Sequence, residues 1–293
     1  MKILVTGATG FIGRELIKKL QNSFVVIALV RDSSDTTKLE AIDCKVESFS
    51  EYDEIVDVFD RYKFAGVIHL ASNILVEHKN SDINSLIDSN ITFSTFLLEA
   101  SKRTKVQWFI NTGTFWQNYE NKGYNPVNLY AATKEAFTTI AKFYTQTSDL
   151  IFTTIKLNDT FGPNDTRAKV FNLWTKIAAS GEKLEMSAGE QIIDISYIDD
   201  VVSAYERLIN LLEENAIEHK DKTYVVSNEE RLSLKNLSLV FEKVTNSQLN
   251  IDWGGREYRD REVMIPYDLG VNVPGWKQKY TLEEAIRKTV KEI

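Results

Sequence analysis

The 293-residue chain begins Met1-Lys2-Ile-Leu-Val-Thr-Gly7-Ala-Thr-Gly10-Phe-Ile-Gly13, and this segment is the most informative about the fold. An aliphatic run leads into three glycines, and a helical pattern follows through Leu20. Gly7 permits a sharp strand-to-helix turn, and Gly10 lets the backbone approach a pyrophosphate closely. A helix starting there directs free N–H groups and its positive dipole end at phosphates. The context predicts a dinucleotide site rather than a plain tight turn, with contacts from Gly7, Thr9, Gly10, Phe11, Ile12 and Gly13.

Outward from this loop, short β-rich runs alternate with helical patterns, which is typical of a parallel sheet with crossover helices. The expected strands are Lys2–Thr6, Phe24–Val30, Gly66–Leu70, Val106–Asn111 and Phe152–Leu157. The expected helices are the one through Leu20, Tyr52–Tyr62, Ile83–Arg103 and Leu129–Thr147. The first half therefore predicts an α/β fold with a doubly wound parallel sheet, the Rossmann arrangement.

After Phe161-Gly162-Pro163 the alternation becomes irregular. Helices are expected over Ala168–Ala179, Ile198–Leu212, Leu232–Val244 and Leu282–Ile293. We expect residues 1–160 to form the dinucleotide-binding domain, with a return segment near 190–226. Residues 161–293 would mainly form a smaller C-terminal substrate-binding lobe.

Bulk properties exclude several function classes. The formal net charge of −7 argues against nucleic-acid binding, which needs a basic face to displace counterions. The longest apolar run, Phe24–Val30, is far below the ~20 residues of a membrane helix. The single Cys44 suits a reducing compartment, and with no signal peptide at Met1 we expect a cytoplasmic protein. The three histidines lack metal-ligand spacing, so no metal is expected.

The residues at the end of the second strand indicate whether the cofactor is NAD or NADP. An NAD enzyme usually places an acidic residue there for the ribose 2′-hydroxyl, whereas an NADP enzyme offers arginine to the 2′-phosphate. Here Arg31 follows the apolar run directly, and Asp32 comes one residue later. NADP(H) is therefore favoured over NAD(H), although both residues could instead be solvated turn residues.

Tyr130 and Lys134 lie one helical turn apart on one face of the helix expected over Leu129–Thr147. Such a spacing is common by chance. Here it follows a strand whose end carries Thr112, downstream of a dinucleotide fold, and this position gives it weight. The three residues are the candidate catalytic group, with a strand-end cap as the alternative role for Thr112.

With these motifs in order, the chain resembles the extended short-chain dehydrogenase/reductases, which include sugar-nucleotide epimerases, dehydratases and reductases. The matching stretches are Thr6–Gly13, His69-Leu70-Ala71-Ser72, Asn90 before Leu97-Leu98-Glu99-Ala100, Tyr130 with Lys134, Phe161-Gly162-Pro163 and Ser196-Tyr-Ile-Asp-Asp200. The resemblance implies further cofactor contacts at Leu70, Ala71, Ser72, Asn90, Asn111, Tyr130, Lys134 and Leu157. It also implies a homodimer formed through the helices around Ile83–Arg103 and Leu129–Thr147.

Within that family, three stretches look similar to CDP-3,6-dideoxyhexose synthases of the CDP-abequose and CDP-paratose type. They are Asn111–Gln117, Leu129–Lys134 and Trp253–Met264. This similarity implies NADPH-dependent reduction of the C4 ketone of a CDP-3,6-dideoxy-4-hexulose, for bacterial O-antigen sugars.

Departures from the family pattern bear on the chemistry. The 4,6-dehydratases follow the catalytic threonine with Asp-Glu, whereas Thr112 is followed by Gly113-Thr114, so dehydration is rejected. An aspartate, Asp159, replaces a usual substrate asparagine, and Ile193 replaces an arginine that contacts the diphosphate. The residues proposed to contact substrate are Thr112, Thr114, Trp116, Asp159, Arg167, Lys169 and Arg259, with Arg261 a further cation.

The expected mechanism makes Tyr130 the general acid at the sugar carbonyl oxygen. A free tyrosine has a pKa of ~10, and we expect Lys134 and the oxidised nicotinamide to lower it toward 7. Two other functions stay open at this point. The first is an epimerase that retains NAD and uses the same residues. The second is a redox-sensing regulator without catalysis, which retention of Tyr130 and Lys134 disfavours.

Overall fold

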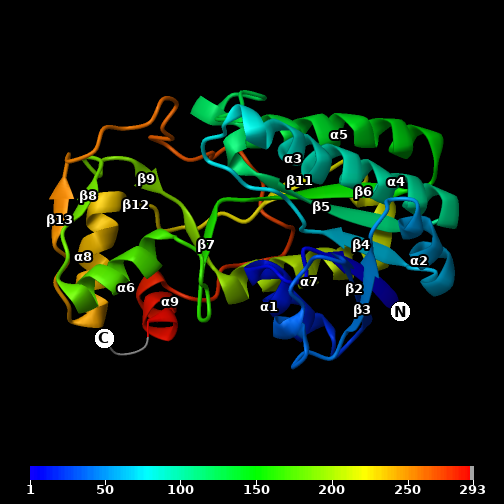
Figure 1. The fold of residues 1–293 in the computed structure, drawn as a ribbon, viewed down its shortest axis with the longest axis horizontal. Helices are drawn as coiled ribbons and strands as arrows, with labels where there is room; N and C mark the ends of the chain where they lie inside the picture. Colours follow the sequence, from blue (N-terminus) through cyan, green and yellow to red (C-terminus); the bar gives the residue numbers. More distant parts are fainter. Residues whose placement is uncertain (291–293) are drawn as a thin grey trace.

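In the computed structural model, which describes residues 1–290, seven parallel strands form the central sheet (Figure 1). Their spatial order is β11-β6-β5-β4-β1-β2-β3. The strands are β1 Lys2–Thr6, β2 Val25–Arg31, β3 Lys45–Phe49, β4 Gly66–His69, β5 Trp108–Thr114, β6 Ile151–Leu157 and β11 Thr223–Val225. The order changes direction beside β1, so the predicted doubly wound parallel sheet is confirmed.

Helices cover both faces of this sheet (Figure 1). One face carries α1 Phe11–Leu20 and α7 Ile198–Asn215, and the other carries α2 Glu54–Tyr62, α4 Phe93–Thr104 and α5 Leu129–Thr147. Because both faces are covered, the inner strands are buried along their length, and every residue of β6 is buried, including the polar Thr153, Thr154 and Lys156. Two separate apolar cores result, one on each side of the sheet.

The long helix predicted over Ile83–Arg103 is interrupted. It consists of α3 Ile83–Ile87, a π-helical turn over Asp88–Thr92, and α4. Single π-turns occur frequently at functional sites. This one carries the buried Asn90 and presents Ser89 to the cavity described below.

Two strands of the sheet were not predicted. Strand β3 is an edge strand whose residues are mostly exposed, so it lacks the apolar run that marks the inner strands. Strand β11 spans only Thr223–Val225 and pairs with β6 about 70 residues earlier in the chain. Neither strand has a periodicity long enough to be recognised locally.

The later segments gather at the left of Figure 1. They are α6 Val170–Ser180, β8 Leu184–Met186, β9 Ile192–Ile193, β12 Leu232–Ser233, α8 Leu234–Thr245, β13 Ile251–Trp253 and α9 Leu282–Thr289. A parallel pair, β7 Asp159–Phe161 and β10 Ile195–Tyr197, lies between this lobe and the sheet. The last predicted helix ran to Ile293, and its final three residues lie outside the described part.

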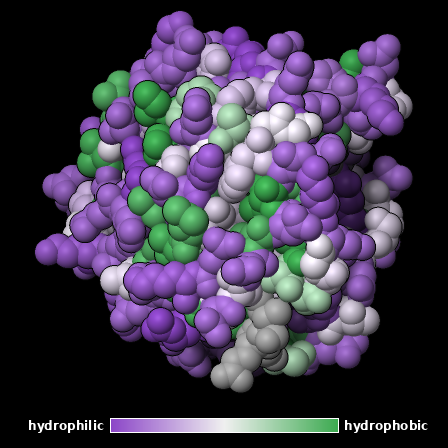
Figure 2. All heavy atoms as spheres, turned by 90° about the vertical axis from the view of Figure 1, so that its left-hand side faces the viewer, coloured by the Kyte–Doolittle hydropathy of each residue, from purple (hydrophilic) through white to green (hydrophobic). Residues whose placement is uncertain are grey.

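Figure 2 looks onto the end of the molecule formed by this lobe. Hydrophobic residues appear there as small separate groups among hydrophilic ones, a distribution that is ordinary for a folded surface. Over residues 1–290, none of the helices has both the length and the apolar character that crossing a bilayer requires.

Candidate active site

A cavity of about 630 Å³ opens at the carboxyl ends of the parallel strands. Its wall includes Gly7 after β1, Arg31 of β2, Leu70 after β4, Thr114 of β5 and Leu157 of β6. Ligands of open α/β sheets bind at this edge, near the point where the strand order changes direction. The cavity therefore lies where the sequence placed the dinucleotide.

The glycine turn forms one side of the cavity. Gly7 has a φ of 69°, and a β-carbon there would lie 2.6 Å from the amide nitrogen of Ala71. A β-carbon at Gly13 would lie 2.2 Å from the Gly7 carbonyl oxygen. Gly10 precedes α1 without a side-chain cap, so the first amides of this helix face the cavity uncapped. Close backbone approach and free N–H groups fit a dinucleotide pyrophosphate.

At the other end of the cavity, Arg31 and Ser34 lie in the wall. The Arg31 Nη2 donates to Ser89 Oγ at 2.9 Å and lies 3.4 Å from the Asp88 carboxylate. Asp32 does not line the cavity, and its carboxylate accepts a hydrogen bond from the Ser50 hydroxyl. This end of the site presents a cation, not an acid.

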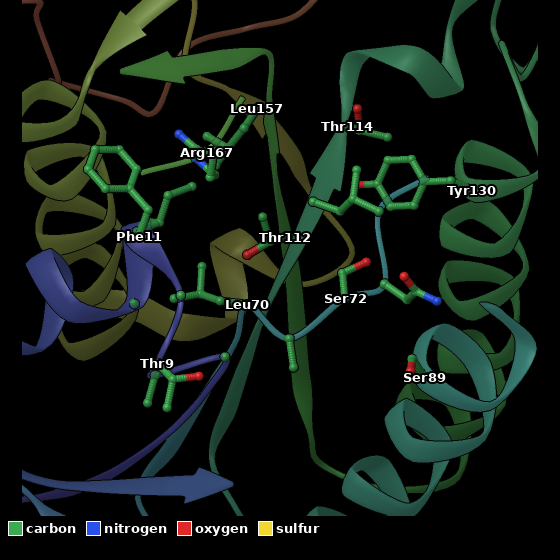
Figure 3. A pocket seen from close by; sticks show the side chains of 18 of the residues that line it. Thr9, Phe11, Leu70, Ser72, Ser89, Thr112, Thr114, Tyr130, Leu157 and Arg167 are labelled. Carbon is green, nitrogen blue, oxygen red and sulfur yellow. The ribbon is translucent and has the colours of Figure 1, made fainter. Parts of the chain in front are cut away.

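Tyr130 of α5 is buried and points into the cavity between Thr114 and Ser72 (Figure 3). Burial raises the pKa of Tyr130 to about 12, and the hydroxyls of Ser72 and Thr114 only partly oppose this effect. In the chain without cofactor this pKa is therefore raised, and the expected lowering toward 7, which includes the charge of the oxidised nicotinamide, stays a prediction for the cofactor complex. Desolvation disfavours the phenolate, and Lys134 does not offset it. Trp116 packs edge-to-face on the Tyr130 ring at 6.3 Å.

Lys134 lies one turn further along α5 and is 1% exposed. Burial lowers the pKa of its ammonium to about 8. Within residues 1–290 its Nζ makes no hydrogen bond or ion pair, and Lys134 is not among the residues that line the cavity. The pKa of His69 lies well below its usual value, mainly because His69 is buried and also because the Lys134 charge is nearby. A buried ammonium with donors to spare fits the hydroxyls of a ribose.

Thr112 lies in the floor of the cavity (Figure 3). Its Oγ1 lies 2.7 Å from the hydroxyl of Tyr205, a fully buried residue of α7. Sequence reasoning missed Tyr205, because an aromatic residue on the apolar face of a helix ordinarily belongs to the core.

Asn90 and Asn111 are buried and do not line the cavity. The Asn90 side-chain oxygen accepts from Ser72 Oγ at 2.9 Å, and its nitrogen donates to Thr133 at 2.9 Å. Asn111 donates to Thr154 at 3.2 Å. In this structure Asn90 holds the cavity residue Ser72 in place.

The two cationic residues of the cavity wall that were proposed to contact a diphosphate, Arg167 and Lys169, each form an ion pair with an aspartate. Arg167 forms a two-pronged ion pair with Asp165, and its guanidinium lies 4.6 Å from the Phe11 ring centroid. Lys169 Nζ lies 2.5 Å from Asp159 Oδ1. Arg167, Lys169 and Asp159 all line the cavity.

Arg259 is exposed and does not line the cavity. Arg261 stacks on Tyr119, with its guanidinium carbon 4.4 Å from the ring centroid, and contacts Asn125. Neither arginine of this loop reaches the cavity wall in this structure.

The cavity thus brings together most of the residues singled out from the sequence. They are Gly7, Thr9, Gly10, Phe11, Ile12, Gly13, Arg31, Leu70, Ala71, Ser72, Thr112, Thr114, Trp116, Tyr130, Leu157, Asp159, Arg167 and Lys169. Asn90, Asn111, Lys134 and Arg259 are not in its wall. Wall residues that sequence reasoning did not single out include Ser34, Asn73, Ser85, Ser89, Asn158 and Thr160. Such small polar residues carry no motif of their own.

Residues 3–226 match the model of the NAD dependent epimerase/dehydratase family. The matched segment begins one residue into β1 and ends one residue after β11, so it includes all seven strands of the central sheet except Lys2.

Curated relatives include CDP-abequose synthase of Salmonella muenchen, which is 28% identical over 98% of this chain and 96% of the relative. CDP-abequose synthase of Yersinia pseudotuberculosis is 26% identical, with both chains covered completely. Among solved structures, a UDP-glucose 4-epimerase of Stenotrophomonas maltophila with bound NAD superposes with a TM-score of 0.86. It is 19% identical and covers 99% of this chain and 96% of its own, a likeness in fold.

Proposed function

The chain belongs to the NAD dependent epimerase/dehydratase family, and from that premise we propose that it reduces the C4 ketone of a nucleotide-activated deoxy-4-hexulose with NADPH. The proposed substrate is a CDP-3,6-dideoxy-4-hexulose, and the product would serve surface-polysaccharide synthesis. Relatives named CDP-abequose synthase, aligned over nearly the full chain, support this choice of substrate class.

The observation that carries the proposal is the kind of group beside Tyr130. Hydroxyls, from Ser72 and Thr114, face the phenol where a dehydratase needs a carboxylic acid pair. The carboxylate in the described cavity wall belongs to Asp159, which is already paired with Lys169. One proton donor without an eliminating acid/base pair suits addition of hydride and proton to a ketone.

In the proposed reaction Tyr130 holds its proton until the carbonyl oxygen needs it. Its raised pKa keeps the phenol protonated at neutral pH, as a general acid requires. NADPH bound in this site would supply the hydride to C4. The C4=O double bond becomes C4–H and O–H, with the proton coming from Tyr130. Lys134 would bind the nicotinamide ribose, and its ammonium would favour the phenolate left behind.

The preference for NADPH is supported by the side chains at the end of β2. Arg31 lies in the wall with Ser34 and Ser89, whose hydroxyls could also donate to a phosphate. Asp32, the residue that would repel a 2′-phosphate, is held away by Ser50. A guanidinium with two hydroxyls is a suitable set of donors for a dianionic group.

We also propose that residues 161–293 mainly supply the substrate-binding lobe, with Arg167 and Lys169 near the diphosphate. A cytoplasmic homodimer through α3, α4 and α5 belongs to the same proposal. Its support is the exposed apolar side chains of Ile83 and Ile87 on α3 and Phe143 on α5. Sedimentation of the purified protein tests the dimer, and a monomer at micromolar concentration would contradict it.

The test of the activity is the absorbance of reduced nicotinamide during turnover of a CDP-4-keto-3,6-dideoxyhexose, with NADPH and NADH assayed in parallel. We expect one NADPH consumed for each ketone reduced, and slower reaction with NADH. No net loss of NADPH, from an enzyme purified with bound NAD, would identify an epimerase instead.

A further inference from the structure

Tyr205 is a buried phenol outside the motifs of the family, yet it touches a residue of the site. It extends from α7, across the sheet from α5, and its hydroxyl lies 2.7 Å from Thr112 Oγ1. The side chain is 0% exposed. Thr112 is only partly buried, because it borders the cavity on its other side. Thr112 therefore contacts Tyr205 in the protein interior on one side and lines the cavity on the other.

The direction of this hydrogen bond follows from counting protons. Within residues 1–290 the Tyr205 hydroxyl has one hydrogen-bond partner, Thr112. If Thr112 donated, the Tyr205 proton would be buried without an acceptor, which costs about 1–3 kcal/mol. If Tyr205 donates, its proton is satisfied. Burial also raises the pKa of Tyr205, so the phenol keeps its proton.

A hydroxyl that accepts one hydrogen bond keeps its own proton for another. Thr112 Oγ1 accepts the hydrogen bond that the Tyr205 hydroxyl donates from the interior, so the Thr112 O–H can rotate toward the cavity. Donation to an oxygen also strengthens that oxygen's O–H as a donor, because hydrogen bonds in a chain polarise one another.

We propose that Tyr205 is a positioning residue that fixes Thr112 as a hydrogen-bond donor to the C4 carbonyl oxygen of the substrate. Two donors, Tyr130 and Thr112, would then stabilise the oxygen as negative charge develops on it. This inference rests on the proposed reduction, since it assigns Tyr205 to the same carbonyl.

The test is a double-mutant cycle with Tyr205→Phe and Thr112→Val. Tyr205→Phe removes only the hydroxyl, and we expect kcat to fall roughly 5- to 20-fold, as for loss of one hydrogen bond. The Kd for NADPH should stay within about twofold. On the Thr112→Val background, Tyr205→Phe should have no further effect on kcat. Tyr224→Phe is the matched control, a buried tyrosine that bonds His219 away from the cavity.

Equal loss of kcat from Tyr205→Phe on both backgrounds, or no loss on the wild-type background, would overturn the inference. Melting temperatures separate damage to the fold from damage to the chemistry. If Tyr205→Phe folds poorly, the double variant Tyr205→Phe/Thr112→Val is compared with Thr112→Val instead. The double variant lacks both hydroxyls, so it leaves no buried polar group unpaired. Its kcat must equal that of Thr112→Val alone.

Failure of the proposed function is seen separately, in the wild-type enzyme. If the wild type consumes no NADPH but inverts C4, the reduction is wrong. The same four proteins are then compared in the epimerisation, where the same oxygen gains and loses charge. The inference concerns the ratio between variants, so either reaction decides it.

Discussion

The Arg31 guanidinium donates to the Ser89 hydroxyl across 2.9 Å and so joins the end of β2 to the π-helical turn before α4. Both side chains line the cavity. The wall at this end is therefore made by two segments nearly 60 residues apart, with its cationic group held in a defined place.

Removal of this cation should change cofactor preference. We expect Arg31→Ala to weaken NADPH binding about 10- to 100-fold, as for loss of a charge-assisted hydrogen bond, and NADH binding less than about threefold. Fluorescence titration with each cofactor measures both. Arg61→Ala, which removes an exposed arginine paired with Glu47 outside the cavity, is the control. Equal weakening for both cofactors would contradict a 2′-phosphate contact.

Loss of the Tyr130 hydroxyl should remove the chemistry and spare binding. We expect Tyr130→Phe to reduce kcat about 10²- to 10⁴-fold, the usual contribution of a general acid. The Kd for NADPH should be nearly unchanged. Tyr144→Phe, another buried tyrosine of α5 outside the cavity wall, should keep its activity. A Tyr130→Phe protein that no longer binds NADPH would mean that the phenol serves the cofactor.

The buried ammonium of Lys134 should lower the free energy of unfolding of the protein at neutral pH. Burial moves its pKa from 10.5 to about 8, which corresponds to at most about 3 kcal/mol of cost at neutral pH. We expect Lys134→Met to lose turnover while the free energy of unfolding at pH 7 rises by about 1–3 kcal/mol. The gain should shrink from pH 8 to pH 10.5, as the folded lysine loses its proton. Urea unfolding measures it, with the exposed Lys142→Met as control, and a destabilised Lys134→Met protein would contradict the assignment.

The same lysine should set an alkaline limit on activity. The ammonium is present below its pKa of about 8 and is lost above it. We therefore expect kcat/KM for the ketone to fall as pH rises through about 8, since this ratio reports groups of the free enzyme. Lys134→Arg keeps its charge at higher pH and should move this limb upward, even if its rate is lower. An unchanged limb in Lys134→Arg would assign it to another group.

The Asp159–Lys169 pair should matter to an anionic substrate through its balance of charge. Lys169→Met leaves the Asp159 carboxylate without a partner in the cavity wall, and we expect KM for the sugar nucleotide to rise at least about tenfold. Adding Asp159→Asn should recover part of that loss. The control is Lys176→Met, an exposed lysine of α6 outside the wall. No recovery in the double variant would mean that Lys169 contacts substrate directly.

The features that could be predicted from the sequence are local motifs and periodic patterns of apolar residues. The glycine turn was recognisable because it follows β1 directly, and strands such as β2 were recognisable because a buried parallel strand is rich in aliphatic residues. The helix over Leu129–Thr147 begins and ends at the residues predicted for it. Tyr130 and Lys134 share one face of it, because residues four apart in a helix always do.

Which groups come into contact, and which charges are left without a partner, depends on packing between distant parts of the chain. Ser50 holds Asp32 out of the site, Asp159 pairs with Lys169, and Tyr205 reaches Thr112 from 93 residues away. Burial also raises the pKa of Tyr130 in the chain without cofactor, an effect that the spacing of Tyr130 and Lys134 does not reveal. Each of these depends on burial and on partners far along the chain. Desolvation and hydrogen bonding are properties of the packed arrangement, and no local pattern of residues specifies them.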